Sequence, residues 1–250
     1  MPSRPPLTHF LCIPLVNATS RNQLSASLAS FHADVTSPDS FGIPEQAVRP
    51  VGTLHLTLGV MSFPKNEGLE QAVSLLKTLV PRQILTAINV PSVDVISGLE
   101  QQGTGMMEPS GPLSPLLTVT LRGLHSMQSA SKASVLYASP VDSEGTLMRF
   151  CENLRSTFQE AGFIAEENRP LLLHATIVNT VYVKGRNTRG GKGKRYDKLT
   201  VDARGILERY DDFVWMQDVP MEKIAICKMG AKKRDDGEEA YEVEAEIDLA

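Results

Sequence analysis

Two segments of the chain carry the same short pattern, and this pattern limits the fold more than any other feature. In both segments, 53–60 and 171–178, polar and apolar residues alternate around a His-x-Thr triplet. Successive side chains of a β-strand point to opposite faces, so the histidine and the threonine of each triplet share a face. We expect two strands that each bury an aliphatic face and present an imidazole and a hydroxyl on the other face: His55 with Thr57, and His174 with Thr176.

The order of elements around the two triplets also repeats. A strand over 8–16 and a helix with Leu24, Leu28 and Phe31 on one face precede the first triplet. A strand over 134–139 and a helix over 145–161 precede the second, and Gly162 is placed to end that helix. Its buried stripe is expected to consist of Leu147, Phe150, Leu154 and Phe158. This repeat predicts two related lobes that face each other, the first over about 8–100 and the second over about 116–250.

Further elements are predicted between and after the triplets. Asn66 is expected to cap a second helix with Leu69, Val73, Leu76 and Val80 along one face. We also expect a strand over 116–121, an irregular loop over 97–115, a helix over 202–209 and strands over 222–228 and 240–249. The last strand alternates acidic with mostly apolar residues, and we interpret the acids as a solvated face and not as a metal site: Glu242, Glu244, Glu246 and Asp248.

Charge and cysteine content exclude several classes of protein. The net charge of −4 argues against a polycation that coats nucleic acid indiscriminately. Cys12, Cys151 and Cys227 form no C-x-x-C pair, which favours neither a disulfide framework nor a zinc site and is typical of a reducing compartment. No apolar stretch approaches the roughly 18 residues that a membrane span needs. We therefore expect no contact with a membrane and a location in the nucleus, the cytoplasm or both.

One basic segment is the candidate for contact with a polyanion. It follows the second triplet directly and is predicted to be a flexible loop over 184–195. A solvated loop without a ligand and a nuclear localisation signal are the alternatives. Its basic residues are Lys184, Arg186, Arg189, Lys192, Lys194 and Arg195.

Paired histidines suit transfer or hydrolysis at a phosphodiester. One neutral imidazole would take a proton from the attacking oxygen, and the second, protonated, would give one to the leaving oxygen. Thr57 and Thr176 could donate to the non-bridging oxygens and stabilise the charge that builds there. This chemistry requires no metal, and we expect no cofactor. The chain has no H-E-x-x-H or G-x-S-x-G motif, and Gly190–Lys194 fails the P-loop pattern.

The other histidines and two aromatic residues need separate consideration. His9, His32 and His125 lie outside the triplets, and we expect structural or surface roles for them. Tyr137 and Trp215 could stack on a base, although packing in the core is the favoured interpretation. Asn179 and Thr180 could support the second triplet.

The pairing of H-L-T-L with H-A-T-I resembles the 2H phosphoesterase superfamily, which includes RNA 2′,3′-cyclic phosphodiesterases. The chain is most similar to the A-kinase anchor protein 7-like phosphoesterase domain, of the type found in activating signal cointegrator 1 complex subunit 1 without its KH module. The matching stretches follow the same order along nearly the whole chain: 8–11, 54–61, 97–100, 135–138, 161–163, 173–180 and 201–207. The resemblance implies an α+β fold of two pseudo-symmetric lobes, with antiparallel sheets lining a central cleft and helices outside. It also allows an exchange of strands between the lobes.

These observations lead to one main hypothesis and one alternative. The main hypothesis is a metal-independent phosphodiesterase acting on RNA ends or small nucleotides with cyclic or 2′,5′-linked phosphates. The alternative is a non-catalytic nucleotide- or RNA-binding subunit of a nuclear coactivator or alkylation-repair complex. The sequence does not say which histidine is the acid and which the base, nor what the oligomeric state is.

Overall fold

Two four-stranded antiparallel sheets form the frame of the protein in the computed structural model, which describes residues 5–89, 117–165, 169–183 and 199–249. The first sheet has the order β10-β7-β1-β2 and the second β5-β4-β3-β6, and a short hairpin pairs β8 with β9. The strands are β1 (His9–Pro14), β2 (His55–Met61), β3 (Thr118–Ser126), β4 (Val135–Pro140), β5 (Ala175–Asn179), β6 (Val214–Pro220), β7 (Lys223–Lys228), β8 (Lys232–Lys233), β9 (Glu239–Ala240) and β10 (Val243–Asp248).

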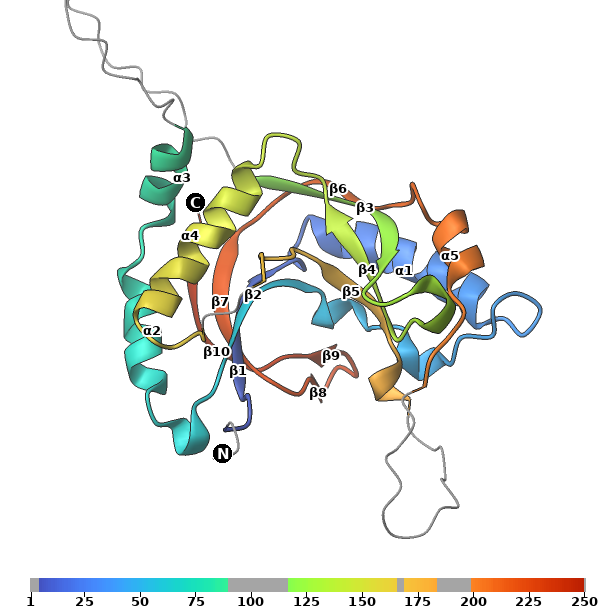
Figure 1. Ribbon diagram of the computed structural model, residues 1–250, viewed down its shortest axis with the longest axis horizontal. Coiled ribbons are helices and arrows are strands. Elements are labelled where there is room, and N and C mark those ends of the chain that lie inside the picture. Colours follow the sequence, from blue (N-terminus) through green and yellow to red (C-terminus); the bar gives the residue numbers. More distant parts are fainter. Residues whose placement is uncertain (1–4, 90–116, 166–168, 184–198, 250) are drawn as a thin grey trace, which may run out of the picture.

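The two sheets meet at their edge strands β2 and β5. β2 contains the first His-x-Thr triplet, and β5 begins within the second. β2 and β5 are in contact, and each is the last strand of its sheet. The Arg49 N–H donates to the Ile177 carbonyl at 2.8 Å, and Val48 forms an antiparallel bridge with Val178. Together the sheets form a curled half-barrel (Figure 1). The mixed α+β architecture with antiparallel sheets confirms the predicted fold class.

The helices lie outside this half-barrel. Two of them follow a strand of one sheet but pack against the other sheet. α1 (Ser20–Thr36) follows β1 but packs on β6 of the second sheet. α4 (Thr146–Glu160) follows β4 but packs on β2 of the first sheet. α2 (Leu69–Thr78) contacts β10, α3 (Pro81–Asn89) contacts α4, and α5 (Arg204–Arg209) contacts β3 (Figure 1).

The helical periodicities read from the sequence correspond to buried faces. In α1 the core positions are Leu24, Leu28, Phe31 and Val35, and in α4 all four residues of the predicted stripe are buried. Gly162, with φ of 77°, ends the region of α4 in a left-handed conformation that glycine adopts without steric cost. The apolar spacing in these two segments was therefore a correct guide.

The prediction for the second helix was wrong in two respects. α2 begins at Leu69 after Gly68, while Asn66 lies in a preceding turn with φ of 63° and caps nothing. The helix ends at Thr78, and Val80 is 47% exposed. Pro81 disfavours helical backbone at the residue before it, so the chain extends there and a separate helix, α3, starts at the proline.

The predicted C-terminal strand is divided into two. β9 pairs with β8, whereas β10 pairs with β7, so the chain changes partner between Ala240 and Val243. A register shift follows, and Val243 is 44% exposed, which breaks the expected alternation. The acids pair with neighbouring side chains: Glu242 with Lys232, Glu246 with Lys223, and Glu244 with His9. β6, which contains the buried Trp215, was not predicted from the sequence.

Two sequence predictions fall on residues outside the described part of the chain. One is the irregular loop over 97–115, and the other is the basic segment with Lys184, Arg186, Arg189, Lys192, Lys194 and Arg195. Among the described helices, none has the length and apolar character that crossing a bilayer requires.

Candidate active site

His55 and Thr57 stand on the partly exposed face of β2. Leu54, Leu56 and Leu58, which point the other way, are 3% exposed or less. The alternation of the sequence therefore produces the predicted arrangement, because burial of the leucine face fixes the register of the strand and turns the polar face outward.

His174 and Thr176 are presented in the same manner on the facing edge. Leu173, Ala175 and Ile177 are buried, whereas His174 and Thr176 are partly exposed. The strand is shorter than predicted, because the ladder with β4 starts only at Ala175, opposite Ala138. His174 thus lies immediately before β5. Contact between β2 and β5 brings the two triplets to the boundary between the two sheets, which we call the seam.

Both imidazoles are held by one hydrogen bond of the same kind. His55 Nδ1 lies 2.8 Å from the Thr53 carbonyl, and His174 Nδ1 lies 2.8 Å from the Leu172 carbonyl. A carbonyl oxygen can only accept, so Nδ1 must carry the proton in both rings. Nε2 of each ring is then the nitrogen available for proton transfer.

The surroundings favour the neutral form of both histidines. Burial is the main cause that lowers the pKa of His55 to about 4; the positive charges of His174 and Arg49 act in the same direction, and the Thr53 carbonyl opposes them. Burial also lowers the pKa of His174, against the opposing effect of the Leu172 carbonyl.

Aromatic rings support each histidine. His55 lies 4.7 Å from the Phe10 ring and 5.2 Å from the Tyr241 ring. On the second sheet, the Tyr137 ring lies 5.4 Å from the His174 ring. The next ring along the second sheet is His125, 5.5 Å from Tyr137. Tyr137 is therefore part of the site region, and exposed His125 stands beside it.

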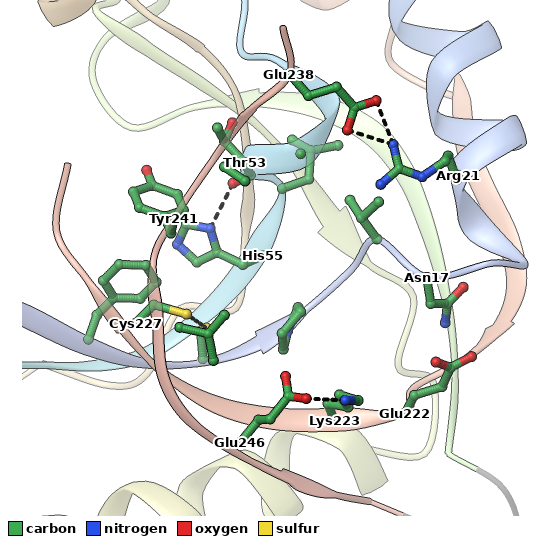
Figure 2. A pocket seen from close by; sticks show the side chains of 18 of the residues that line it. Asn17, Arg21, Thr53, His55, Glu222, Lys223, Cys227, Glu238, Tyr241 and Glu246 are labelled. Carbon is green, nitrogen blue, oxygen red and sulfur yellow. Dashed lines mark hydrogen bonds and ion pairs between the residues drawn. The ribbon is translucent and has the colours of Figure 1, made fainter. Parts of the chain in front are cut away.

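A pocket of about 300 Å³ opens beside His55 and is lined by residues of β1, β2, β7 and β10. Phe10, His55 and Tyr241 form one wall, as Figure 2 shows for His55 and Tyr241. The Arg21–Glu238 ion pair, with N–O distances of 2.7 and 2.9 Å, spans another part of the lining. The Cys12 thiol donates to Cys227 Sγ at 3.8 Å in the same wall. Thr57 and the second triplet do not line this pocket, so the pocket lies beside His55 and not between the two triplets.

Three residues near His55 were not predicted from the sequence: Arg49, Tyr182 and Tyr241. Arg49 is only 5% exposed, and its guanidinium carbon lies 3.7 Å from the centre of the Tyr182 ring. Burial, followed by the neighbouring Tyr182, raises the pKa of Tyr241 to about 12, whereas Arg49 opposes this shift. These residues come from three separate segments and form no local motif, so only the tertiary fold groups them.

The other residues considered in the sequence have structural positions. Trp215 is fully buried, and its Nε1–H donates to the Gly123 carbonyl at 2.8 Å, so its role is in the core. His9 is 1% exposed and bonds to the Thr8 hydroxyl at 2.8 Å. Asn179 accepts from the Val181 N–H, and the Thr180 hydroxyl donates to the Leu199 carbonyl, which fixes the turn after β5.

The depressed pKa of His55 predicts a specific dependence of stability on pH. The unfolded chain binds a proton near pH 6.5 and the folded protein only near pH 4, so the free energy of unfolding falls as pH decreases through this window. The contribution is fully present above pH 6.5 and amounts to at most about 3 kcal/mol. Urea unfolding at pH 7 and pH 4.5 should show a smaller loss for His55→Gln than for the wild type. His32→Gln should retain the wild-type loss, and equal losses in all three proteins would contradict the assignment.

Sequence comparison places the chain among known proteins. The sequence model of the AKAP7 2′5′ RNA ligase-like domain matches residues 7–249. The chain belongs to this family. An uncharacterised protein of Schizosaccharomyces pombe is 31% identical over 116 residues, which cover 46% of this chain and 50% of that protein. Activating signal cointegrator 1 complex subunit 1 of Mus musculus is 25% identical over 215 residues, or 84% of this chain and 51% of that protein.

The chain thus spans about half the length of the curated relatives that it matches. Among solved structures, LigT of E. coli complexed with 3′-AMP has a TM-score of 0.50 at 17% identity, with 98% of each chain covered. A protein of Thermus thermophilus has a TM-score of 0.50 at 18% identity, with 97% of each chain covered. These likenesses show the LigT-like 2H phosphoesterase fold, as the family resemblance of the sequence implied.

Proposed function

We propose that this member of the family is a metal-independent phosphodiesterase that acts on RNA ends or small nucleotides with cyclic or 2′,5′-linked phosphates. The observation that carries the proposal is the matched presentation of two imidazoles on adjoining strand edges. Each ring is anchored through Nδ1 to a carbonyl at 2.8 Å, which leaves Nε2 for the reaction. Proton removal and proton donation at one phosphate need two groups placed in this way.

The electrostatic environment suggests how the two roles are divided. His55 has its pKa lowered to about 4, so in the free protein it is neutral and suited to accept a proton. Burial also lowers the pKa of His174. At His55, by contrast, the positive charges of His174 and Arg49 add to the effect of burial. Binding of an anionic phosphate favours imidazolium, because opposite charges stabilise each other in a poorly solvated site. We assign His55 as the general base and His174 as the general acid, with Thr57 and Thr176 as donors to the non-bridging oxygens.

The pocket beside His55 supplies a place for a nucleoside. Its aromatic side chains offer stacking surfaces, and its volume of about 300 Å³ matches the lower range of small-ligand sites. The proposal gains support from LigT of E. coli, whose structure was solved with 3′-AMP. The six basic residues of 184–195 are proposed as further contacts for a longer polyanion.

A non-catalytic role is the second candidate, and one observation favours it. Burial lowers the pKa of both histidines, which disfavours the protonated imidazole that acid catalysis needs. Together with the similarity to a complex subunit in Mus musculus, this supports a nucleotide- or RNA-binding subunit of a nuclear coactivator or repair complex.

A substrate screen separates the two candidates. Wild type and a His55→Ala/His174→Ala double variant are incubated with 2′,3′-cyclic nucleotides and 2′,5′-linked oligonucleotides in the presence of EDTA. We expect product with the wild type only, because the proposed chemistry uses side chains alone. Binding without product, at protein concentrations comparable to substrate, would favour the binding subunit. Equal product from both proteins would refute the paired-histidine mechanism.

A further inference from the structure

Arg49 occupies an unusual place in the fold. It lies between two short turns, Glu45–Ala47 and Val51–Thr53, on the approach to β2. Its backbone N–H donates to Ile177 in β5, at 2.8 Å. The residue is therefore tied to both edge strands at the seam where the two His-x-Thr triplets meet.

The Arg49 side chain is buried but incompletely paired. The residue is 5% exposed, and one face of its guanidinium covers the Tyr182 ring at 3.7 Å. Within the described residues, Nη2 has no hydrogen-bond partner and no carboxylate forms an ion pair with this arginine. A buried guanidinium without an anion is costly, because the lost hydration is not replaced. Such a donor is suited to an anionic ligand.

The surroundings of Arg49 connect it to the candidate active site. Tyr241 interacts electrostatically with both Arg49 and Tyr182, and its ring meets His55 edge-on at 5.2 Å. Arg49 also contributes positive potential at His55. The seam thus combines a fixed cation with two histidines. Of the three carboxylates that line the neighbouring pocket, Glu238 and Glu246 are paired with basic residues, and the third is Glu222.

We propose that Arg49 is a substrate-binding residue whose Nη2 donates to an anionic oxygen of the phosphate held between the two His-x-Thr triplets. This inference rests on the proposed function for the location of the phosphate, but it does not require turnover. Tyr182 holds the planar guanidinium in place, so little side-chain entropy is lost when the anion binds. A lysine would provide a point charge at this position and not the planar fork.

Binding of inorganic phosphate tests the proposal without any reaction. Isothermal titration calorimetry is performed on the wild type, Arg49→Gln and Arg204→Gln at constant ionic strength. Loss of one charge-assisted hydrogen bond should weaken phosphate binding by about 10- to 100-fold in Arg49→Gln. Arg204 is exposed and paired with Asp202, so the matched control should bind within about twofold of the wild type. Wild-type affinity in Arg49→Gln, or no phosphate binding by the wild type, would overturn the proposal.

A second measurement covers the case in which Arg49→Gln does not fold. Phosphate is titrated into the wild type while the side-chain resonances of Arg49, His55 and His174 are followed by NMR. We expect the Arg49 guanidinium and both imidazoles to shift with one common Kd. Shifts of the imidazoles with an unchanged Arg49 signal would refute the arginine contact. Failure of the proposed catalysis is recognised independently, as absence of product in the substrate screen.

Discussion

Replacement of His55 or His174 by alanine is expected to lower kcat for a cyclic or 2′,5′-linked substrate by about 10²–10⁴-fold each. Each substitution removes one of the two Nε2 atoms that would transfer a proton at the phosphate. The effect should appear mainly in kcat, because Thr57, Thr176 and the neighbouring pocket remain to bind the substrate. The double variant should be little slower than the less active single variant, since the effects of residues that act as a unit are not additive.

The pH dependence of the rate provides the control for this prediction. The wild type should show a bell-shaped profile of kcat/KM, with one limb from the base and one from the acid. With His55 as base, His55→Ala should lose the acidic limb and His174→Ala the alkaline limb. His32→Ala, outside the site, should retain both limbs and the wild-type rate. Full activity in the double histidine variant would exclude the mechanism.

Replacement of Trp215 by alanine is expected to lower the free energy of unfolding by about 3–5 kcal/mol. The indole is fully buried, and its ring centre lies 5.1 Å from Phe31 and 4.8 Å from Phe213. Its Nε1–H also donates to the Gly123 carbonyl, which would lose a buried partner. Because Phe31 belongs to α1 and Trp215 to β6, the cavity would loosen the packing that holds this helix against the second sheet.

Urea unfolding followed by circular dichroism is the suitable measurement, because Trp215 is the only tryptophan and its fluorescence is lost in the variant. Trp215→Phe keeps most of the apolar volume but not the hydrogen bond, and it should cost clearly less than the alanine variant. Val214→Ala on the same strand, where the side chain is 42% exposed, should change stability little. A loss below about 1 kcal/mol in Trp215→Ala would contradict the central role of this contact.

The spacing of apolar residues predicted correctly those strands and helices in which one regular spacing decides which face is buried. The leucines of 54–58 and the stripe of α4 are buried as expected, because a strand or helix exposes a fixed face once its apolar residues enter a core. Periodicity was a poor guide at two places where the backbone or a strand partner decides the structure. At Val80 the following proline interrupts the helix, and after Ala240 the chain exchanges β8 for β7 as its partner.

The resemblance to this family was already visible in the sequence, because the two triplets and the other matching stretches follow the same order along nearly the whole chain. The grouping of Arg49, Tyr182 and Tyr241 was not visible, since these residues share no motif and lie far apart in the sequence. Their proximity depends on β10 joining the first sheet and on the contact between β2 and β5.

The sequence by itself determined which face of each triplet strand is polar, because alternation at a period of two residues is a local property of the backbone. Only the tertiary structure decided that the two edges adjoin, that α1 and α4 cross between sheets, and that a buried arginine stands beside His55. These features arise from long-range packing. Its stability depends on the apolar area that distant segments bury against each other, and the pattern of one segment does not contain that information.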